Sequence, residues 1–225
     1  MNTRLPEKRL LRAMLEERRL DEIAELASAH RCIFGTLVSL TFDSEALAAW
    51  RAVEALGVAC ARVADHDPQF AREQLRRLLW LITEESGGIC WRAPEAMAEI
   101  VSQRLDLFGD YVPIVAHLPV ETAEEDLEHF RPGMLWAVGR LGVSARAAAP
   151  DVIGSVEASL TRPDPPSRAM AAWCLGRFGE TELLARRREL LADAAPVEVY
   201  EAGQLRHTTV ASITAAALRG APRAP

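Results

Sequence analysis

A short motif recurs four times along this chain, and this recurrence constrains the fold more than any other feature of the sequence. Residues 50–57 read WRAVEALG and residues 91–98 read WRAPEAMA, with five of eight positions identical. Residues 136–142 (WAVGRLG) and 173–179 (WCLGRFG) share four of seven positions. One alignment joins both pairs, at spacings of 41, 41 and 37 residues, when it superposes Gly57, Ala98, Gly139 and Gly176. Units of this length cannot bury an apolar face alone, so they must stack on one another.

The superposed position is small in every copy, which predicts a close crossing of neighbouring helices there. Gly and Ala permit such an approach, although Gly costs about 1 kcal/mol of helix propensity relative to Ala. The same alignment makes Arg131 equivalent to Arg168, each eight residues before its glycine. We therefore expect the repeats to form equivalent helices that touch at the small residue.

Composition and periodicity favour helices throughout the rest of the chain. Aromatic residues make up only 6% of the sequence, too few for a large β-sandwich or barrel. Asp67 is expected to cap a helix that has Pro68 in its first turn. The expected helical segments are residues 7–28, 33–42, 43–64, 69–84, 90–104, 109–119, 132–142, 149–160, 166–178, 181–193 and 206–219.

The motif carries a resemblance to a known repeat. Residues 164–168 (DPPSR), followed by AAWCLG at 171–176, resemble the HEAT-type repeat and especially its bilin-lyase-like variant, as do residues 50–57. Residues 87–96 are similar to a segment of uncharacterised bacterial HEAT-repeat proteins. The resemblance implies an all-α, right-handed α-solenoid of about five HEAT-like helical hairpins. It implies one domain over residues 1–225, with N-terminal capping helices at 1–42, central repeats at 43–193 and a C-terminal cap at 194–225.

Each copy of the motif places a tryptophan on the side of its helix away from the alanine-rich core stripe. Two interpretations stay open. The tryptophans fill the seams between stacked repeats, or they form a ridge that binds a partner together with neighbouring charged residues. The candidate ridge residues are Trp50, Arg51, Glu54, Trp91, Arg92, Glu95, Trp136 and Trp173.

A second candidate surface lies on the helix expected at residues 69–84. Arg72, Arg76 and Trp80 are spaced at i, i+4 and i+8, beside a leucine-rich core stripe. The HEAT resemblance implies that this second helix of a pair lines the concave surface. Arg and Trp are enriched in binding hot spots, so the face suits a partner. The alternative is packing against the next repeat, and the exposure of Trp80 separates the two.

Catalytic and metal chemistry find little support in the sequence. The five histidines show no metal-binding spacing, and we expect no metal, no cofactor and no catalytic residue. Cys90, just before a helix start, is either a reactive thiolate or a packed thiol. Gly87-Gly88 is interpreted as a helix break rather than a phosphate loop, and the charged runs at 121–128 and 186–188 as solvated segments.

Charge and cysteine usage narrow the function further. The net charge of −6 disfavours nucleic acid as a partner. No segment predicts a signal peptide or a membrane span, and the unpaired pattern of four cysteines is typical of a cytoplasmic protein. The favoured function is a non-catalytic scaffold that holds a protein or peptide, as a monomer or weak homo-oligomer. The alternatives are a lyase-like maturation factor that positions a tetrapyrrole or other cofactor, and a HEAT-like DNA glycosylase, which the charge disfavours.

Overall fold

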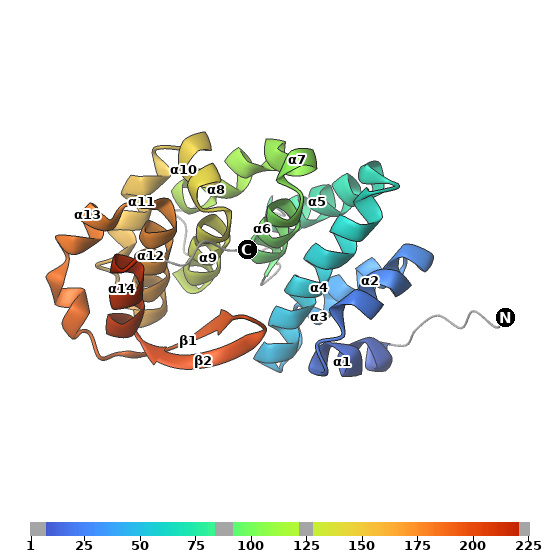
Figure 1. The fold of residues 1–225 in the computed structure, drawn as a ribbon, viewed down its shortest axis with the longest axis horizontal. Coiled ribbons are helices and arrows are strands. Elements are labelled where there is room, and N and C mark those ends of the chain that lie inside the picture. Colours follow the sequence, from blue (N-terminus) through green and yellow to red (C-terminus); the bar gives the residue numbers. More distant parts are fainter. Residues whose placement is uncertain (1–7, 84–91, 122–127, 221–225) are drawn as a thin grey trace. The chain divides into compact units, whose positions relative to one another are not determined.

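The computed structural model describes residues 8–83, 92–121 and 128–220, and this part of the protein is mostly helical with one two-stranded sheet (Figure 1). The chain falls into two compact units. The first holds residues 1–109 and 202–204, and the second holds residues 110–201 and 205–225. Among the described helices, none is long and apolar enough to cross a lipid bilayer. The helical class is confirmed, whereas the single continuous domain stays a prediction.

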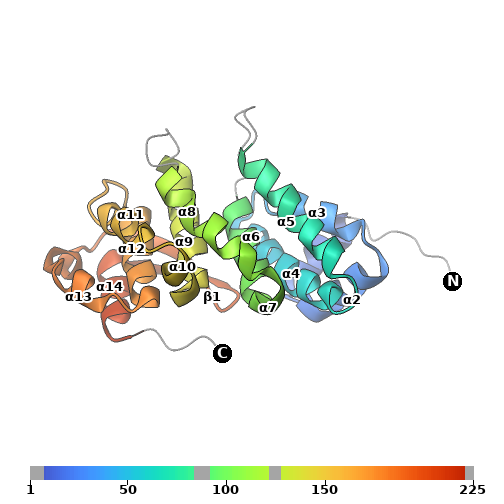
Figure 2. The ribbon, with the colours of Figure 1, turned by 90° about the horizontal axis from the view of Figure 1, so that it is seen from above.

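The first unit is built around one long helix. Its elements are α1 (Lys8–Glu16), α2 (Leu20–Ala29), α3 (Ile33–Leu40), α4 (Ala46–Ala64), α5 (Pro68–Thr83), α6 (Ala93–Gln103) and α7 (Leu105–Phe108). Helix α4 packs against α1, α2, α3, α5 and α6, and Figure 2 shows α5 alongside it. Small and apolar residues cover most of the circumference of α4, so the helix is buried on most sides.

The second unit contains shorter helices and the sheet. Its elements are α8 (Val112–Glu121), η2 (Glu128–Phe130), α9 (Arg131–Leu141), α10 (Val143–Ala148), α11 (Val152–Ser159), α12 (Pro165–Phe178), α13 (Thr181–Ala185), η3 (Arg188–Ala192), β1 (Pro196–Glu201), β2 (Gln204–Thr209) and α14 (Val210–Leu218). The short helix η1 (Gly109–Tyr111) precedes α8. Helix α12 packs between α9 and α14, and its contacts with these two helices form the centre of the unit (Figure 1).

Two helix starts follow the expected Asp-Pro pattern. The Oδ1 atom of Asp67 accepts a hydrogen bond of 3.0 Å from the backbone N–H of Phe70, and α5 begins at Pro68 as predicted. Asp164 accepts a bond of 2.8 Å from the N–H of Ser167 at the start of α12. In each case the carboxylate satisfies a backbone donor that has no partner inside the helix.

The small repeat position lies where helices cross, as predicted. A Cβ atom built on Gly57 of α4 would lie 2.6 Å from Cγ of Glu99 in α6. A Cβ atom on Gly139 of α9 would lie 2.4 Å from the ring of Trp173 in α12. Real Cβ contacts do not come this close, so only glycine fits either crossing without a shift of its neighbour.

A third close crossing lies at Gly176, the last of the four superposed positions. A Cβ atom on Gly176 of α12 would lie 2.8 Å from Cβ of Ala217 in α14. Ala217 follows Gly176 by 41 residues, which is the spacing of the first copies. Helix α14 therefore crosses α12 at the spacing of the first copies, although it lacks the tryptophan and arginine of the motif.

The C-terminal region departs from the expected helices. The helix expected at 181–193 is divided into α13 and the 3-10 helix η3. The helix expected at 206–219 is wrong in its first part, because residues 204–209 form β2, which pairs with β1. Helix α14 starts only at Val210, where the hydroxyl of Thr209 caps it by accepting a bond of 3.1 Å from the N–H of Ser212.

The turn of this hairpin explains why it was missed. Ala202 and Gly203 both have positive φ angles, of 50° and 80°, as the central residues of a type I′ turn require. Asn-Gly or Asp-Gly normally marks such a turn. Alanine gives no such signal in a chain where it is the common helix former.

Candidate binding surfaces

The outward face of α5 carries the most exposed tryptophan that the structure describes. The side chains of Leu75 and Leu78 are buried, and Trp80 follows two residues later, about 200° further round the helix. Trp80 is accordingly 60% exposed. Arg76, one turn earlier, is also exposed, and its Nη1 atom pairs with the carboxylate of Glu73.

A further arginine belongs to this face and was missed by the sequence analysis. Arg77 is exposed, and its Nη1 atom donates to Oε1 of Gln74 over 3.3 Å. Its position directly after Arg76 in the sequence was the available signal. We call Arg76, Arg77 and Trp80 the α5 strip.

Arg72 does not take part in the α5 strip, contrary to expectation. Its Nη2 atom donates a hydrogen bond of 2.5 Å to the carbonyl oxygen of Leu107, and its guanidinium carbon lies 5.8 Å from the ring centroid of Phe108. These residues end α7, where carbonyl groups have no partner within the helix. The side chain of Arg72 therefore holds the end of α7 and has a structural role.

The tryptophans of the second unit fill a seam between helices. Trp136 of α9 is only 8% exposed and Trp173 of α12 is half-buried. Their rings stack with centroids 6.4 Å apart and an interplanar angle of 10°. The ring of Trp173 also covers Gly139. The stacking favours the seam interpretation at these two positions, and it leaves Trp136 little surface for a partner.

Most candidate ridge residues of the first unit also contact neighbouring residues of that unit. The guanidinium carbon of Arg92 lies 4.3 Å from the ring centroid of Trp50, a cation–π contact between the start of α6 and α4. Glu95 is buried beside Arg92. Trp91 lies outside the described residues.

Arg51 and Glu54 likewise contact other parts of the first unit. Arg51 is buried, and its Nη1 atom donates to the carbonyl oxygens of Leu15 and Glu16 over 3.1 and 2.6 Å. It thus satisfies carbonyls at the end of α1. Glu54 accepts two bonds, of 3.1 and 2.6 Å, from Arg18. The burial of Arg51 contradicts its proposed place on an exposed ridge.

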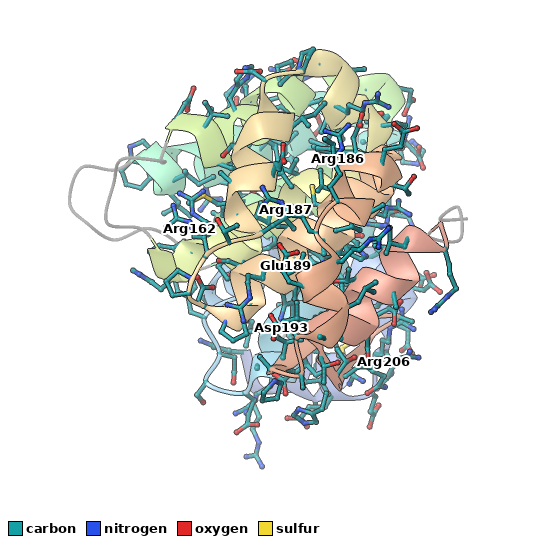
Figure 3. All side chains as sticks on the ribbon, turned by 90° about the vertical axis from the view of Figure 1, so that its left-hand side faces the viewer. Arg162, Arg186, Arg187, Glu189, Asp193 and Arg206 are labelled. Atoms are coloured by element: carbon teal, nitrogen blue, oxygen red, sulfur yellow. The ribbon has the colours of Figure 1, made fainter. Side chains whose placement is uncertain are left out.

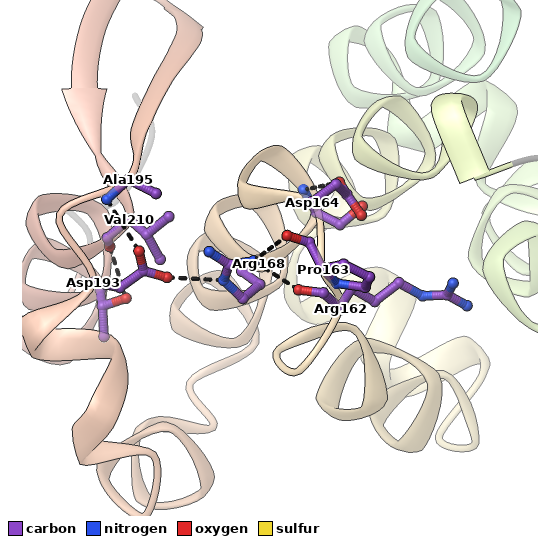
Figure 4. Close-up of polar contacts among 9 residues, drawn as sticks. Arg162, Pro163, Asp164, Arg168, Asp193, Ala195 and Val210 are labelled. Carbon is purple, nitrogen blue, oxygen red and sulfur yellow. Dashed lines mark hydrogen bonds and ion pairs between the residues drawn. The ribbon is translucent and has the colours of Figure 1, made fainter.

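Arg168 joins three segments of the second unit (Figure 4). Its Nε atom donates to Oδ2 of Asp193 over 2.8 Å, and its Nη1 atom donates to the carbonyl oxygens of Arg162 and Pro163 over 2.7 Å each. The bond from Arg168 holds the pKa of Asp193 below its usual range. Arg131, its repeat equivalent, is buried and donates to the carbonyl of Pro119 over 3.5 Å. Both arginines therefore tie the start of a repeat helix to the segment before it.

The end of the second unit that carries α13 and η3 presents charges of both signs (Figure 3). Arg186 and Glu189 are exposed there, and Arg187 lies 3.4 Å from the carboxylate of Glu157. The arginine run is exposed as expected, but it lies at the end of α13 rather than within a longer helix. Because positive and negative side chains both lie on this end of the unit, it does not offer the uniformly positive surface that attracts a nucleic acid.

The three cysteines that the structure describes comprise one exposed and two buried thiols. Cys32, Cys60 and Cys174 are free, and only Cys32 is exposed. Burial raises the pKa of Cys60 and Cys174 far above the usual value for a thiol. Within the described residues, no group of three or more His, Cys, Asp or Glu side chains could hold a metal ion. Cys90, Gly87-Gly88 and most of the acidic run at 121–128 lie outside the described residues.

Comparison with known proteins informs the fold and not the function. No family model matches the sequence, and a search of curated proteins gives no match. Among solved structures, the chain is similar to an engineered protein, a target of the Northeast Structural Genomics Consortium. The TM-score is 0.55 at 18% identity, over 95% of this chain and 89% of that one. At this identity the likeness shows a shared fold alone, and the HEAT resemblance stays a prediction.

Proposed function

We propose that the protein is a non-catalytic binding module, a right-handed HEAT-like α-solenoid that holds a protein or peptide on the α5 strip. The observation that carries the proposal is the 60% exposure of Trp80. A large aromatic side chain on the surface is a common binding anchor, because a partner that covers it buries a large apolar area.

The solenoid part of the proposal is supported by the recurring register of the helices. Gly57 contacts α6 from α4, Gly139 contacts α12 from α9, and Gly176 contacts α14 from α12. The glycine and its neighbour are 42 residues apart at the first crossing, 34 at the second and 41 at the third. A glycine of one helix that repeatedly contacts a later helix is typical of stacked repeats. The free thiols of Cys32, Cys60 and Cys174 support the proposed cytoplasmic location.

The charges of the α5 strip indicate which partner it suits. The pair between Arg76 and Glu73 is solvent-exposed on both sides, and such pairs contribute only about 0–1 kcal/mol. A carboxylate of a partner can therefore replace Glu73 at little cost. We propose a partner segment that places an apolar side chain on Trp80 and a carboxylate one helical turn away, near Arg76 or Arg77.

The test compares Trp80→Ala with Phe42→Ala, a matched control because Phe42 is also an exposed aromatic residue of the first unit, outside α5. Urea denaturation comes first, and Trp80→Ala should unfold within about 0.5 kcal/mol of the parent, as surface substitutions usually do. Immobilised parent, Trp80→Ala, Arg76→Glu and Phe42→Ala proteins are then compared by quantitative capture of a partner. Affinity for that partner should fall by about 2 kcal/mol, or roughly 30-fold, for Trp80→Ala.

Two results would contradict the proposal. A loss of about 3–5 kcal/mol of stability in Trp80→Ala would mean that Trp80 is a packing residue. A partner bound equally well by the parent and by Trp80→Ala would place the binding surface elsewhere.

A further inference from the structure

A buried carboxyl group lies at the start of α6 with an incomplete set of partners. Glu95 is the third residue of α6 and is 2% exposed. Its Oε1 atom lies 3.4 Å from Nη1 of Arg92. Its Oε2 atom is buried and has no hydrogen bond within the part of the chain that the structure describes. A carboxylate in such a position lacks the hydrogen bonds that normally compensate a buried charge.

Arg92 contacts both this carboxyl and an aromatic ring. Its guanidinium carbon lies 4.3 Å from the ring centroid of Trp50, on α4. The 3.4 Å contact with Glu95 is long for a charge-assisted hydrogen bond. Arg92 therefore compensates a negative charge on Glu95 only in part.

The other charged groups on the elements packed around α6 have partners of their own. On α4, Arg51 binds carbonyl oxygens, Glu54 binds Arg18 and Arg62 pairs with Glu25. On α5, α6 and α7 the pairs are Arg72 with Leu107, Glu73 with Arg76, Arg77 with Gln74, Glu99 with Gln103, and Asp106 with Arg104. Of all these charges, Arg92 is the one that acts on the pKa of Glu95.

Burial has a larger effect than Arg92 on the pKa of the Glu95 carboxyl. It raises the pKa of Glu95 to about 7, against the opposing charge of Arg92. The packed form of α6 thus favours the neutral acid, whereas a hydrated carboxyl ionises near pH 4.5. A group whose pKa is raised in the packed form stabilises that form at low pH, and this stabilisation is lost as the pH rises through the packed-state pKa.

We propose that Glu95 is a proton-operated latch on the first turn of α6. As the neutral acid, it lets residues 93–99 stay packed against α4, with Arg92 on the face of Trp50. When the proton leaves, the carboxylate requires water and a full counter-charge, so the first turn of α6 opens. The device makes the order of this helix respond to pH in the physiological range.

Amide hydrogen exchange of the full chain tests the latch. Protection of the segment 92–104 is measured at pH 6 and pH 8, with exchange times scaled for the intrinsic effect of pH. The open fraction of α6 should rise about tenfold between these pH values, since the open state titrates near 4.5 and the packed state near 7. Segments of α12 should show no such change.

Two variants and one direct titration serve as controls for the hydrogen-exchange experiment. Glu95→Gln cannot lose a proton, so its protection should be the same at pH 6 and pH 8 and at least as high as that of the parent at pH 6. Glu73→Gln removes an exposed carboxyl on α5 and should keep the response of the parent. The ¹³C shift of the Glu95 carboxyl in the parent should show a midpoint near pH 7.

The proposal fails if that carboxyl titrates below pH 5. It also fails if the parent and Glu95→Gln show the same dependence of exchange on pH. The carboxyl titration uses the unmodified protein, so it decides the question even if Glu95→Gln does not fold.

Discussion

Replacing Gly139 by alanine should force the seam between α9 and α12 apart. The added Cβ would lie 2.4 Å from Cζ3 and 2.7 Å from Cε3 of Trp173, and 3.2 Å from Cα of Cys174. Carbon atoms in contact normally lie about 3.5–4.0 Å apart, so the overlap is about 1 Å. The ring of Trp173 cannot retreat freely, because it is stacked on Trp136.

The expected change in the free energy of unfolding of Gly139→Ala is the sum of two opposing contributions. Overpacking of this kind costs about 1–3 kcal/mol. Alanine gains up to about 1 kcal/mol over glycine through helix propensity. Gly154 of α11 provides the matched control, since a Cβ added there meets nothing within 4 Å. Gly154→Ala should therefore show the propensity gain alone, and Gly139→Ala should be about 1–3 kcal/mol less stable than this control.

Urea denaturation followed by far-UV circular dichroism measures both variants. A double-mutant cycle tests whether Trp173 is the cause of the effect. Trp173→Leu should lower the free energy of unfolding of the parent substantially. In the Gly139→Ala background it should lower it much less, because the smaller side chain makes room for the new Cβ. Equal stability of Gly139→Ala and Gly154→Ala would refute the close crossing at Gly139. Additive effects in the cycle would show that Trp173 is not the neighbour that glycine accommodates.

The remaining predictions concern one helix cap and the thiols. Asp164→Ala should lower the free energy of unfolding by about 1 kcal/mol, because the N–H of Ser167 loses its acceptor, and Asp164→Asn should restore most of the loss in the same denaturation assay. In a Cys90→Ser background, a disulfide reagent at pH 8 should label Cys32 rapidly, while Cys60 and Cys174 should react only as the protein unfolds. Fast labelling of three thiols in the native protein would contradict the burial of the last two.

The sequence predicts the helices well because their signals are local. Asp67-Pro68 and Asp164-Pro165 mark helix starts through a side chain and a backbone restriction that act within one turn. The hairpin of β1 and β2 escaped prediction for the opposite reason. Ala202 adopts a φ of 50°, which its own preferences do not favour, so the surrounding structure and not the local sequence sets this turn.

The candidate site shows where local signals are insufficient. Trp50 precedes its small repeat residue by seven positions, whereas Trp136 and Trp173 precede theirs by three. On a helix these offsets differ by four residues, so the rings lie on the same side but about one turn apart. At the first position the ring contacts Arg92, and at the other two the rings stack on each other between neighbouring helices. Trp80 belongs to no copy of the motif. The sequence placed Trp80 outside the leucine stripe of its helix, but only the structure could show how far its side chain is exposed.

The three glycine crossings differ in what the neighbouring helix presents, and this difference explains why the contact between α12 and α14 has no counterpart in the sequence motif. At Gly57 the neighbour is the side chain of Glu99, and at Gly139 it is the ring of Trp173. At Gly176 it is Ala217, whose Cα lies 3.0 Å and whose carbonyl oxygen lies 3.2 Å from the Cβ position. There the helices meet almost backbone to backbone, and α14 satisfies the contact with alanine alone. A close crossing in this protein therefore requires glycine on one helix only, and the neighbouring helix can present an acidic side chain, an aromatic ring or an alanine.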